Sequence, residues 1–456
     1  MSVFGYIVLK EGYNNIMINS NDIQRYILSL VEEQRTPGIK LPGARQIADT
    51  LGCSLLYVQG VLRTLTQCGV LESLPRSGTY IRPDWEQRVL MNNLVIYHEE
   101  LPHFKAFKEH FEKAFPDFYC SDRFKNGSIE LKVTHDVLAH RDDYADLSEL
   151  FNQCFPEKSL FFQEPLRDFY CAGKLVGIPL VFSPGVICCN RELFKQAGVE
   201  LPSPDWDFET FYATVCRLRK ALPETCGVIN LKAIANWWFY CITASGGEIL
   251  DREAEDPVAF DSPAAIRGLC ALRKLKEALL SEAGRFLNDR VCFAQNRLAM
   301  FMGFRQSVFH FKDMDTCLLP LPTMGGPRTN FMGGDLLVFR KECTDTLLMK
   351  RVIKFMLSPE IQVLFGKTYG GIPLLKKAAE ACLDEKEDRV YLDALPHMRC
   401  DYHFYGLEPM LFLRKGMDRL LSFPAERIPE AAKEFAAAFR TYLEIYFFHN
   451  NWRKRS

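Results

Sequence analysis

Several features that would place this chain in a common functional class are missing from its sequence. No window approaches eighteen uninterrupted apolar residues, which excludes a membrane-spanning helix. The sixteen cysteines are scattered, with no C-x-x-C pair and no His/Cys group at zinc spacing, so we expect no metal site and no disulfide framework. The formal net charge is only -1, and it therefore indicates no nucleic-acid or membrane partner by itself.

Targeting and catalytic patterns are also missing. The first residues, MSVFGYIVLKEGYNN, lack the basic stretch, the apolar run and the cleavage site of a signal peptide. A chain with sixteen cysteines and no such signal is expected in a reducing compartment, so we predict a cytoplasmic location. The sequence contains no glycine-rich phosphate loop, no serine-nucleophile elbow and no HExxH. A glycosidase would need a pair of carboxylates, for which Asp142 and Asp143 are the candidates. Adjacent aspartates are, however, typical of a solvated turn. We predict a non-enzyme with no catalytic residue and no cofactor.

Residues 41–81 carry the helix and turn signals of a winged helix–turn–helix. A short amphipathic helix ends at Gly52, and Ser54 is placed to cap a second helix with apolar residues at helical spacing. A basic hairpin around Arg76-Ser77-Gly78 follows. This arrangement is typical of domains that place the second helix in a major groove and the hairpin beside the phosphates.

The same region resembles the GntR family of regulators. Residues 38–59, GIKLPGARQIADTLGCSLLYVQ, are similar to the family line G-x-x-LPS-x-R-x-LA-x-x-L-G-V-S-R-x-T-V-R, and residues 76–81, RSGTYI, to the wing G-x-G-T-F-V. Arg45 is kept, whereas Leu55 and Gln59 stand in place of two recognition-helix arginines. The resemblance implies a DNA-binding domain over residues 20–84, after an N-terminal extension over residues 1–19. The candidate DNA-binding residues are Arg45, Ser54, Leu55, Tyr57, Gln59, Arg63, Arg76, Ser77 and Gly78.

The chemistry of these positions bears on how DNA would be bound. Gln59 can bond an adenine edge, and Leu55 offers apolar contact to a thymine methyl. Residues 21–84 hold seven Lys and Arg against six Asp and Glu, a net charge of +1, which favours a dimer on a palindromic site over one copy. The alternative is a winged helix that has lost DNA affinity and serves as a dimerisation module.

At 456 residues the chain is too long for a single hydrophobic core. After the hairpin the sequence pattern changes to alternating strand-like and helix-like segments. Residues 94–97 and 131–134 are short apolar runs typical of strands, and Phe104, Phe107 and Phe111 mark an amphipathic helix between them. Single strands separated by helices predict a mostly parallel, helix-covered sheet.

This second region resembles the carbohydrate-binding group of bacterial extracellular solute-binding proteins, the maltose-binding type. The resemblance rests on GKLVGIP at 173–179, CNRELFKQAG at 189–198 and WDFETF at 206–211. Further matches follow in family order at Trp237-Trp238-Phe239, Gly246-Gly247, 260–265, 299–303, 319–322, Gly333-Gly334, 358–362 and 371–373. It implies a two-lobed α/β effector domain over residues 92–456, with strands crossing between lobes that close on a ligand.

A sugar site needs flat aromatic rings for the C–H face and amide or charged groups for the hydroxyls. Trp237 and Trp238 stand where the family places cleft aromatics, although adjacent helical residues point about 100° apart and core packing is an equal alternative for each. Arg305 stands where the family often has a tryptophan, and we expect it to bond a ligand hydroxyl or acidic group. The full set of ligand-binding candidates is Trp237, Trp238, Phe304, Arg305, Gly334, Asp335, Tyr402 and Tyr405.

Together the two resemblances predict a multidomain fold, a mainly α winged helix followed by a two-lobed α/β domain of the periplasmic-binding-protein type. The predicted function is a cytoplasmic transcriptional regulator that binds operator DNA as a homodimer and responds to a mono- or oligosaccharide. The alternative is a non-catalytic carbohydrate-binding protein whose winged helix no longer binds DNA.

Overall fold

The computed structural model describes residues 20–33, 38–83, 85, 93–95, 102–116, 118–121, 127–229, 231, 237–251, 254–279, 288–399 and 406–450. It divides into two compact units. Unit 1 comprises Met1–Val95 and Phe115–Ser128, and unit 2 comprises Ile96–Ala114 and Ile129–Ser456. Each unit contains a hydrophobic core of its own.

Unit 1 contains the predicted winged helix. Its elements are α1 (Ser20–Glu33), α2 (Ala44–Leu51), α3 (Leu55–Gln67), β1 (Leu71–Leu74) and β2 (Gly78–Ile81), with β1 and β2 antiparallel. Gly52 ends α2 in the left-handed conformation at a φ of 64°, which an L side chain adopts only at a cost. The Ser54 side chain caps α3 by accepting from the Leu56 amide at 3.3 Å. The helix–turn–helix signals read from the sequence are confirmed.

The core of unit 1 forms where the apolar faces of the three helices meet. Ile27 of α1, Ile47 of α2 and Val58 of α3 are fully buried, and Trp85 packs against the same cluster. Burial of each such side chain stabilises the fold by about 1.5–3 kcal/mol. Unit 1 also holds a parallel pair of short strands, β3 (Asn93–Val95) and β4 (Tyr119–Ser121).

Unit 2 is built on one long sheet. Five of its strands are neighbours in the order β5-β12-β8-β10-β9, and the others attach to β8 or β12. Their bounds are β5 (Ile129–Val133), β8 (Ile178–Asn190), β9 (Gly227–Ile229), β10 (Leu298–Phe304), β11 (Thr316–Leu319), β12 (Asn330–Phe339), β13 (Ile372–Pro373) and β14 (Met398–Arg399). A small hairpin of β6 (Tyr170–Cys171) and β7 (Lys174–Leu175) is separate.

Strands β8 and β12 connect two lobes. Residues 335–339 of β12 pair with β5 in the first lobe, whereas residues 185–190 of β8 pair with β10 and β11 in the second lobe. Every residue of β8 is buried, as expected for a strand covered on both faces. The two strands run in opposite directions, so their pairing is antiparallel. The expectation of a mostly parallel sheet is therefore wrong for the described strands, because the crossing strands impose antiparallel partners.

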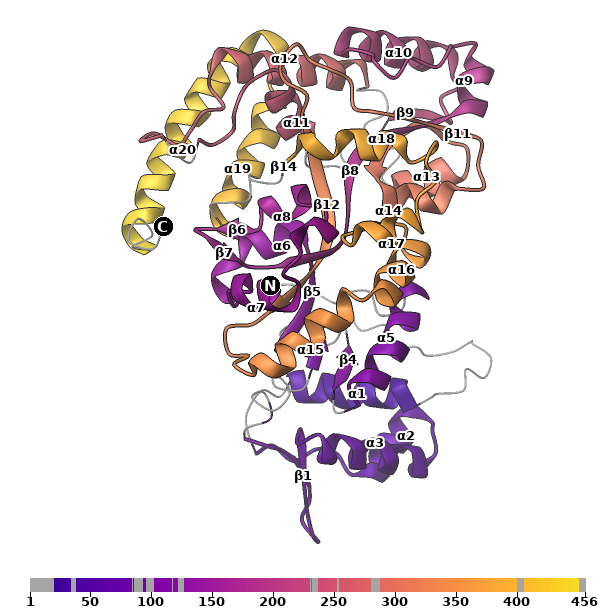
Figure 1. Cartoon of the computed structure of the whole chain (residues 1–456), viewed down its shortest axis with the longest axis vertical. Coiled ribbons are helices and arrows are strands. Elements are labelled where there is room, and N and C mark those ends of the chain that lie inside the picture. The colour runs from indigo at the N-terminus through magenta and orange to yellow at the C-terminus, as the bar shows by residue number, and fades with distance from the viewer. Residues whose placement is uncertain are drawn as a thin grey trace. The chain divides into compact units, whose positions relative to one another are not determined.

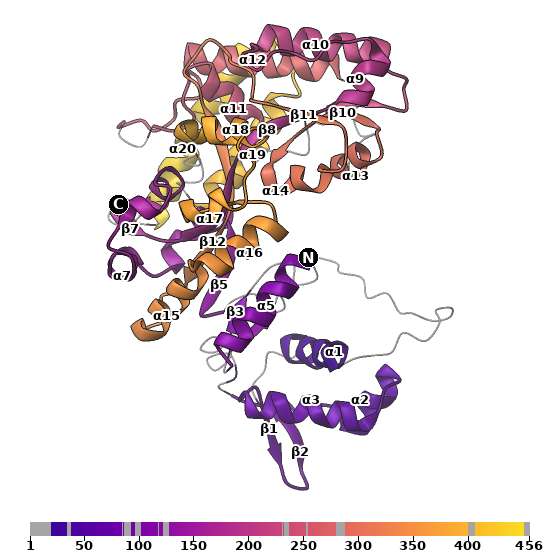
Figure 2. The same ribbon diagram turned by 45° about the vertical axis from the view of Figure 1, so that its right-hand side comes forward.

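Helices cover both lobes. Figures 1 and 2 show α9, α10 and α12 gathered at one end of unit 2, and α15 with α16 toward the other. The helices of unit 2 are α5 (Pro102–Ala114), α6 (Thr134–Ala139), α7 (Ser148–Cys154), α8 (Glu164–Arg167), α9 (Arg191–Ala197), α10 (Phe208–Ala221), α11 (Trp237–Ala244), α12 (Pro263–Ala278), α13 (Asp289–Ala294), α14 (Arg305–Val308), α15 (Thr346–Met356), α16 (Pro359–Thr368), α17 (Lys376–Glu380), α18 (Arg389–Ala394), α19 (Leu407–Leu420) and α20 (Ile428–Asn450).

The point where the chain passes between lobes is held by one side chain. Asn330, at the start of β12, accepts from the Gly185 amide and donates to the Gly185 carbonyl, both at 2.9 Å. A Cβ at Gly185 would lie 2.5 Å from the Phe331 ring, so only glycine allows this approach. The two crossing strands are thereby fixed to each other.

Candidate functional sites

The exposed side of α3 is the first candidate site. Val58, Val61, Leu62 and Leu65 face the core, and the opposite side of the helix is open to solvent. Of the residues predicted to bind DNA, Arg45, Tyr57, Gln59 and Arg63 are exposed, Leu55 is half-buried against the unit 1 core, and Ser54 serves as the helix cap.

Leu56, next to the half-buried Leu55, is the residue that sequence reasoning missed on this helix. Its side chain is 77% exposed. The register of the helix distinguishes the two, because Leu55 packs on the core cluster and Leu56 points one hundred degrees away, about the angle between adjacent helical residues. Of these two leucines, Leu56 is therefore the one whose side chain is open to solvent.

The wing is the second part of this site. The Ser77 amide donates to the Leu74 carbonyl at 3.0 Å, and Arg76 has a φ of 63°. Residues 74–77 therefore form a turn with Pro75 at its second position and a positive φ at its third, which is the pattern of a type II turn. Glycine is the usual residue at the third position, which Arg76 occupies here. Ser77 Oγ lies 2.7 Å from the Tyr80 hydroxyl, and Gly78 has a φ of 123°. Arg76, Ser77 and Gly78 are all exposed.

Lys40 adds a cation beside the wing that the sequence analysis did not assign. The Leu41 amide donates to the Thr79 carbonyl at 2.8 Å, which attaches this segment to β2. A Cβ at Gly78 would lie 2.6 Å from Cε of Lys40. The Lys40 ammonium lies 6.0 Å from the centroid of the Tyr80 ring. The signal that would have found it is the alternation of residues 39–41, which reads as a short third strand.

In unit 2, the two tryptophans of α11 lie in the core of the second lobe. Trp237 is 3% exposed and stacks on Phe211 with ring centroids 5.9 Å apart, and Trp238 is 4% exposed. Every residue of α11 is buried, as expected for a helix that is apolar all round. Both tryptophan rings are thus packed in the core, which is one of the two alternatives that the sequence left open.

Phe304 and Gly334 lie where the crossing strands approach each other. Phe304 is half-buried and meets Phe331 edge to face at 5.4 Å. A Cβ at Gly334 would lie 2.8 Å from the Val181 carbonyl, and the Gly334 carbonyl accepts from the Thr134 hydroxyl at 3.2 Å. These residues shape the junction of the lobes. Tyr402 and Tyr405 lie outside the described residues.

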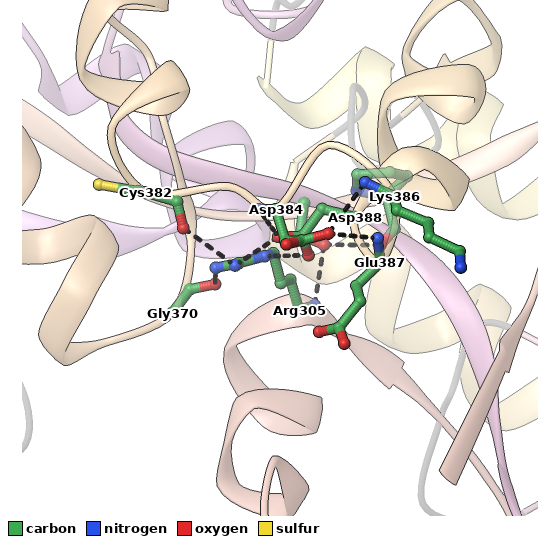
Figure 3. Close-up of polar contacts among 9 residues, drawn as sticks. Arg305, Gly370, Cys382, Asp384, Lys386, Glu387 and Asp388 are labelled. Carbon is green, nitrogen blue, oxygen red and sulfur yellow. Dashed lines mark hydrogen bonds and ion pairs between the residues drawn. The ribbon is translucent and has the colours of Figure 1, made fainter.

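Arg305 makes a buried ion pair with Asp388 (Figure 3). Its Nε and Nη2 donate to the two carboxylate oxygens at 2.7 and 2.8 Å, and Nη1 donates to the Gly370 carbonyl at 2.6 Å. The Cys382 carbonyl accepts from Nη2 at 3.4 Å. The guanidinium is thus held by the segment that leads into α18, within the chain.

Asp335 is a buried carboxyl on the crossing strand β12. Burial raises its pKa to about 7, against a smaller lowering by a hydrogen bond from the Tyr369 hydroxyl. The pKa of Tyr369 is raised by burial and by the nearby Asp335 charge. Oδ1 of Asp335 has no hydrogen-bond partner among the residues that the structure describes.

A cavity of about 400 Å³ opens between the loop after β11 and the segment of α18. Its size is that of a small-molecule pocket. Apolar atoms of Pro320, Leu321 and Val390 line part of it. The polar lining residues are Asp205, Tyr240, Thr323, Arg328, Thr329, Asn330, Arg389, Asp393 and His397.

The cavity wall contains both hydrogen-bond donors and acceptors. Arg389 Nε donates to Asp393 at 2.8 Å, so a cation and an acceptor stand side by side. The buried Thr329 hydroxyl has no partner among the described residues. None of the six described ligand-binding candidates from the sequence lines the cavity, which uses other residues of the same or neighbouring elements.

Other kinds of site find less support in the described part of the chain. It shows no cluster of His, Cys, Asp and Glu suited to a metal ion. None of its helices has the length and apolar character to cross a membrane. Asp142 and Asp143 are exposed in a short 3₁₀ turn, as the solvated-turn interpretation predicts.

Comparison with known families agrees with this two-unit arrangement. Residues 127–391 match the family described as bacterial extracellular solute-binding protein. The chain belongs to this family. Residues 20–81 match the bacterial regulatory proteins of the gntR family. Both are non-catalytic families, one of regulators and one of solute-binding proteins. No curated protein matches the chain.

Solved structures of solute-binding proteins share the fold. The GacH receptor of Streptomyces glaucescens, solved unliganded and with acarbose, is 17% identical, with 77% of this chain and 99% of that chain covered at a TM-score of 0.63. Maltose-bound MalE3 of T. maritima is 16% identical over the same shares, also at 0.63. UgpB of Mycobacterium tuberculosis, solved with glycerophosphocholine, is 17% identical at 0.62, with 77% and 99% covered. At these identities the likeness concerns the fold.

Proposed function

We propose that this protein is a cytoplasmic transcriptional regulator that binds operator DNA through its winged helix and responds to a carbohydrate bound in unit 2. One observation carries the proposal. A regulator-family helix–turn–helix with an exposed second helix and a domain of the solute-binding family occur in a single chain.

The DNA-binding part rests on the surface of α3 and the wing. Arg45 and Arg63 are exposed cations, and Arg76 with Lys40 adds positive charge at the wing. One copy neutralises few phosphates, and affinity grows with that number, so we propose that a homodimer binds an inverted repeat.

The ligand-binding part rests on the cavity beside the crossing strands. Each sugar hydroxyl both donates and accepts, and the cavity offers donors on Arg328 and Arg389 together with an acceptor on Asp393. Its apolar walls suit the C–H face of a sugar ring. Three solved relatives in fold are described with acarbose, maltose or cycloalternan, which favours a carbohydrate here as well.

Regulation requires that the sugar bind two states of the protein with different affinity. In such systems the coupling free energy is typically about 1–3 kcal/mol. The crossing strands β8 and β12, which belong to both lobes, are the element whose arrangement we propose the ligand biases.

The DNA part is tested with the full-length chain and a randomised duplex pool from which bound sequences are selected. We expect one sequence to be enriched, and Arg45→Ala to weaken its binding by about 1–3 kcal/mol if the guanidinium meets a base edge. Arg217→Ala, an exposed arginine of α10, is the control and should bind like the parent chain. Light scattering of the complex should show two chains per duplex, and a monomer on DNA would contradict the dimer.

The ligand part is tested by thermal shift against a panel of mono- and oligosaccharides. A bound sugar stabilises the native state by about 2.7 kcal/mol at a hundredfold excess over its dissociation constant. Addition of that sugar should then change the affinity for the selected duplex. A shift with amino acids or peptides and none with sugars would overturn the carbohydrate assignment.

A carbohydrate-binding protein without DNA affinity is the second candidate function. The observation in its favour is that the first eight residues of α3, Leu55–Leu62, contain no cation. Enrichment of no duplex, together with a thermal shift by a sugar, would establish this candidate instead.

A further inference from the structure

Gly60 lies in the middle of α3 on its exposed side. Glycine in a helix interior is less stable than alanine, because it loses more backbone freedom on folding. A Cβ built at Gly60 would meet no atom within 4 Å. No packing contact among the described residues therefore explains why this position lacks a side chain.

At the glycines of the other described helices, a side chain would clash with neighbouring atoms of the chain. A Cβ would lie 2.1 Å from the Cys241 carbonyl at Gly268, 2.6 Å from the Cys382 sulfur at Gly366 and 1.9 Å from the Phe435 ring at Gly416. Each of these glycines permits a close approach between packed segments. By the same physical logic, Gly60 permits a close approach to a partner outside the chain.

The residues around Gly60 indicate the chemistry of that partner. Leu56 lies one turn before Gly60 on the same face, and Arg63 lies one turn after it. Gln59 directly precedes Gly60 and lies one turn after Leu56 and one turn before Arg63. An exposed leucine matches the methyl group of thymine, and a glutamine bonds the N6 and N7 edge of adenine. Arg63, at the ninth position of α3, is a cation of the type that contacts DNA phosphates.

We infer that α3 lies in the major groove over A·T base pairs, with Gly60 allowing its backbone to approach the base edges. This inference rests on the DNA binding proposed above and adds the sequence class of the operator. Leu56 contacts a thymine methyl, and Gln59 bonds an adenine. The exposed cations Arg45, Arg63 and Arg76 would complement the phosphates.

The test begins with a pool of duplexes of about 30 base pairs, long enough for two half-sites one helical turn apart. Full-length protein should select A·T base pairs at the centre of each half-site. Replacing thymine by uracil at these positions removes only the methyl group. We expect binding to weaken about fivefold, the lower end of the effect of losing one specific base contact. In Leu56→Ala the thymine and uracil duplexes should bind equally.

The outcomes separate the two levels of the argument. Selection of G·C pairs at these positions, or an equal uracil effect in the parent chain and in Leu56→Ala, overturns the A·T assignment while leaving DNA binding intact. Selection of no duplex overturns the proposed function itself and this inference with it.

Gly60→Ala tests the close approach independently. The variant should unfold at a higher temperature, by about 2–8 °C, because alanine favours the helix. It should nevertheless bind the selected duplex at least fivefold more weakly. Gln67→Ala, at the end of the same helix, is the control and should bind within twofold of the parent chain. Undiminished binding by a stabilised Gly60→Ala variant would overturn the close approach.

Discussion

The Arg305 guanidinium and the Asp388 carboxylate form a two-pronged pair, with nitrogen–oxygen distances of 2.7 and 2.8 Å. The residues are only 8% and 6% exposed. Arg305 follows β10, and Asp388 directly precedes α18, which lines the cavity. Asp388 also accepts from the Asp384 amide at 2.9 Å. The pair therefore holds the α18 segment against the sheet.

Breaking this pair should destabilise the protein strongly. Asp388→Asn leaves the Arg305 charge buried without its counter-charge, and we expect a loss of about 3–5 kcal/mol in the free energy of unfolding. Arg305→Lys keeps the charge but loses the planar fork, so it should also destabilise. Urea unfolding measures both.

The exposed pair of Arg191 and Asp315, 3.4 Å apart, supplies the control for this prediction. Asp315→Asn should change stability by less than about 1 kcal/mol, because solvent screens the charges. Equal effects of Asp315→Asn and Asp388→Asn would show that Arg305 is not a structural anchor.

Asp335 should make stability depend on pH. Its pKa is about 7 in the folded chain against an ordinary value of 3.8, so the native state holds the extra proton between these values. The free energy of unfolding should therefore fall as the pH rises from about 4 to about 7, by up to about 1.4 kcal/mol per pH unit, and level off above. In Asp335→Asn this fall should shrink, with a gain in stability at pH 8. Urea titrations at one ionic strength measure it, and an unchanged pH profile would contradict the assignment.

The sequence predicted which elements form the sites better than which side chains reach them. In the winged helix, Gly52 and Ser54 fix the turn locally, so the exposed face of α3 follows from helical spacing. The sequence did not reveal that Leu55 packs on the core while Leu56 is exposed, because a difference of one residue in register decides which leucine meets the core.

In unit 2 the resemblance predicted two lobes joined by crossing strands, which the fold confirms, but it did not say which strands cross. It did not reveal the partner of Arg305, since Asp388 lies 83 residues further along the chain. Nor did it reveal that Trp237 stacks on Phe211, because an apolar helix gives no sign of which face meets a ligand. Long-range pairing of buried groups depends on the tertiary fold, which local spacing does not encode.

Thr329 should discriminate ligand binding from folding. Thr329→Val removes a buried hydroxyl that has no partner among the described residues, so the free energy of unfolding should stay the same or rise by about 1 kcal/mol. Affinity for the sugar found by thermal shift should fall about fivefold to tenfold, the effect of one lost hydrogen bond of about 1 kcal/mol. Calorimetric titration measures the affinity.

Thr243→Val is the matched comparison for Thr329→Val. The Thr243 hydroxyl donates within α11, to the Phe239 carbonyl at 3.0 Å, and its residue is 2% exposed. This variant should lose about 1 kcal/mol of stability. A Thr329→Val variant that loses stability and keeps its sugar affinity would exclude the cavity as the ligand site.

Arg76 should trade stability for DNA binding. It occupies a left-handed backbone conformation at a φ of 63°, which costs a non-glycine residue about 1–2 kcal/mol. Arg76→Gly should therefore stabilise unit 1 by about 1 kcal/mol while weakening binding to the selected duplex. The loss should fall on all sequences alike and reduce the dependence of log affinity on log salt by about one, as for a single phosphate contact. Arg76→Asn tolerates the same backbone without the charge, so it should bind as weakly as Arg76→Gly. If both variants kept the parent affinity and salt dependence, the wing would make no phosphate contact, and the strain at Arg76 would need another explanation.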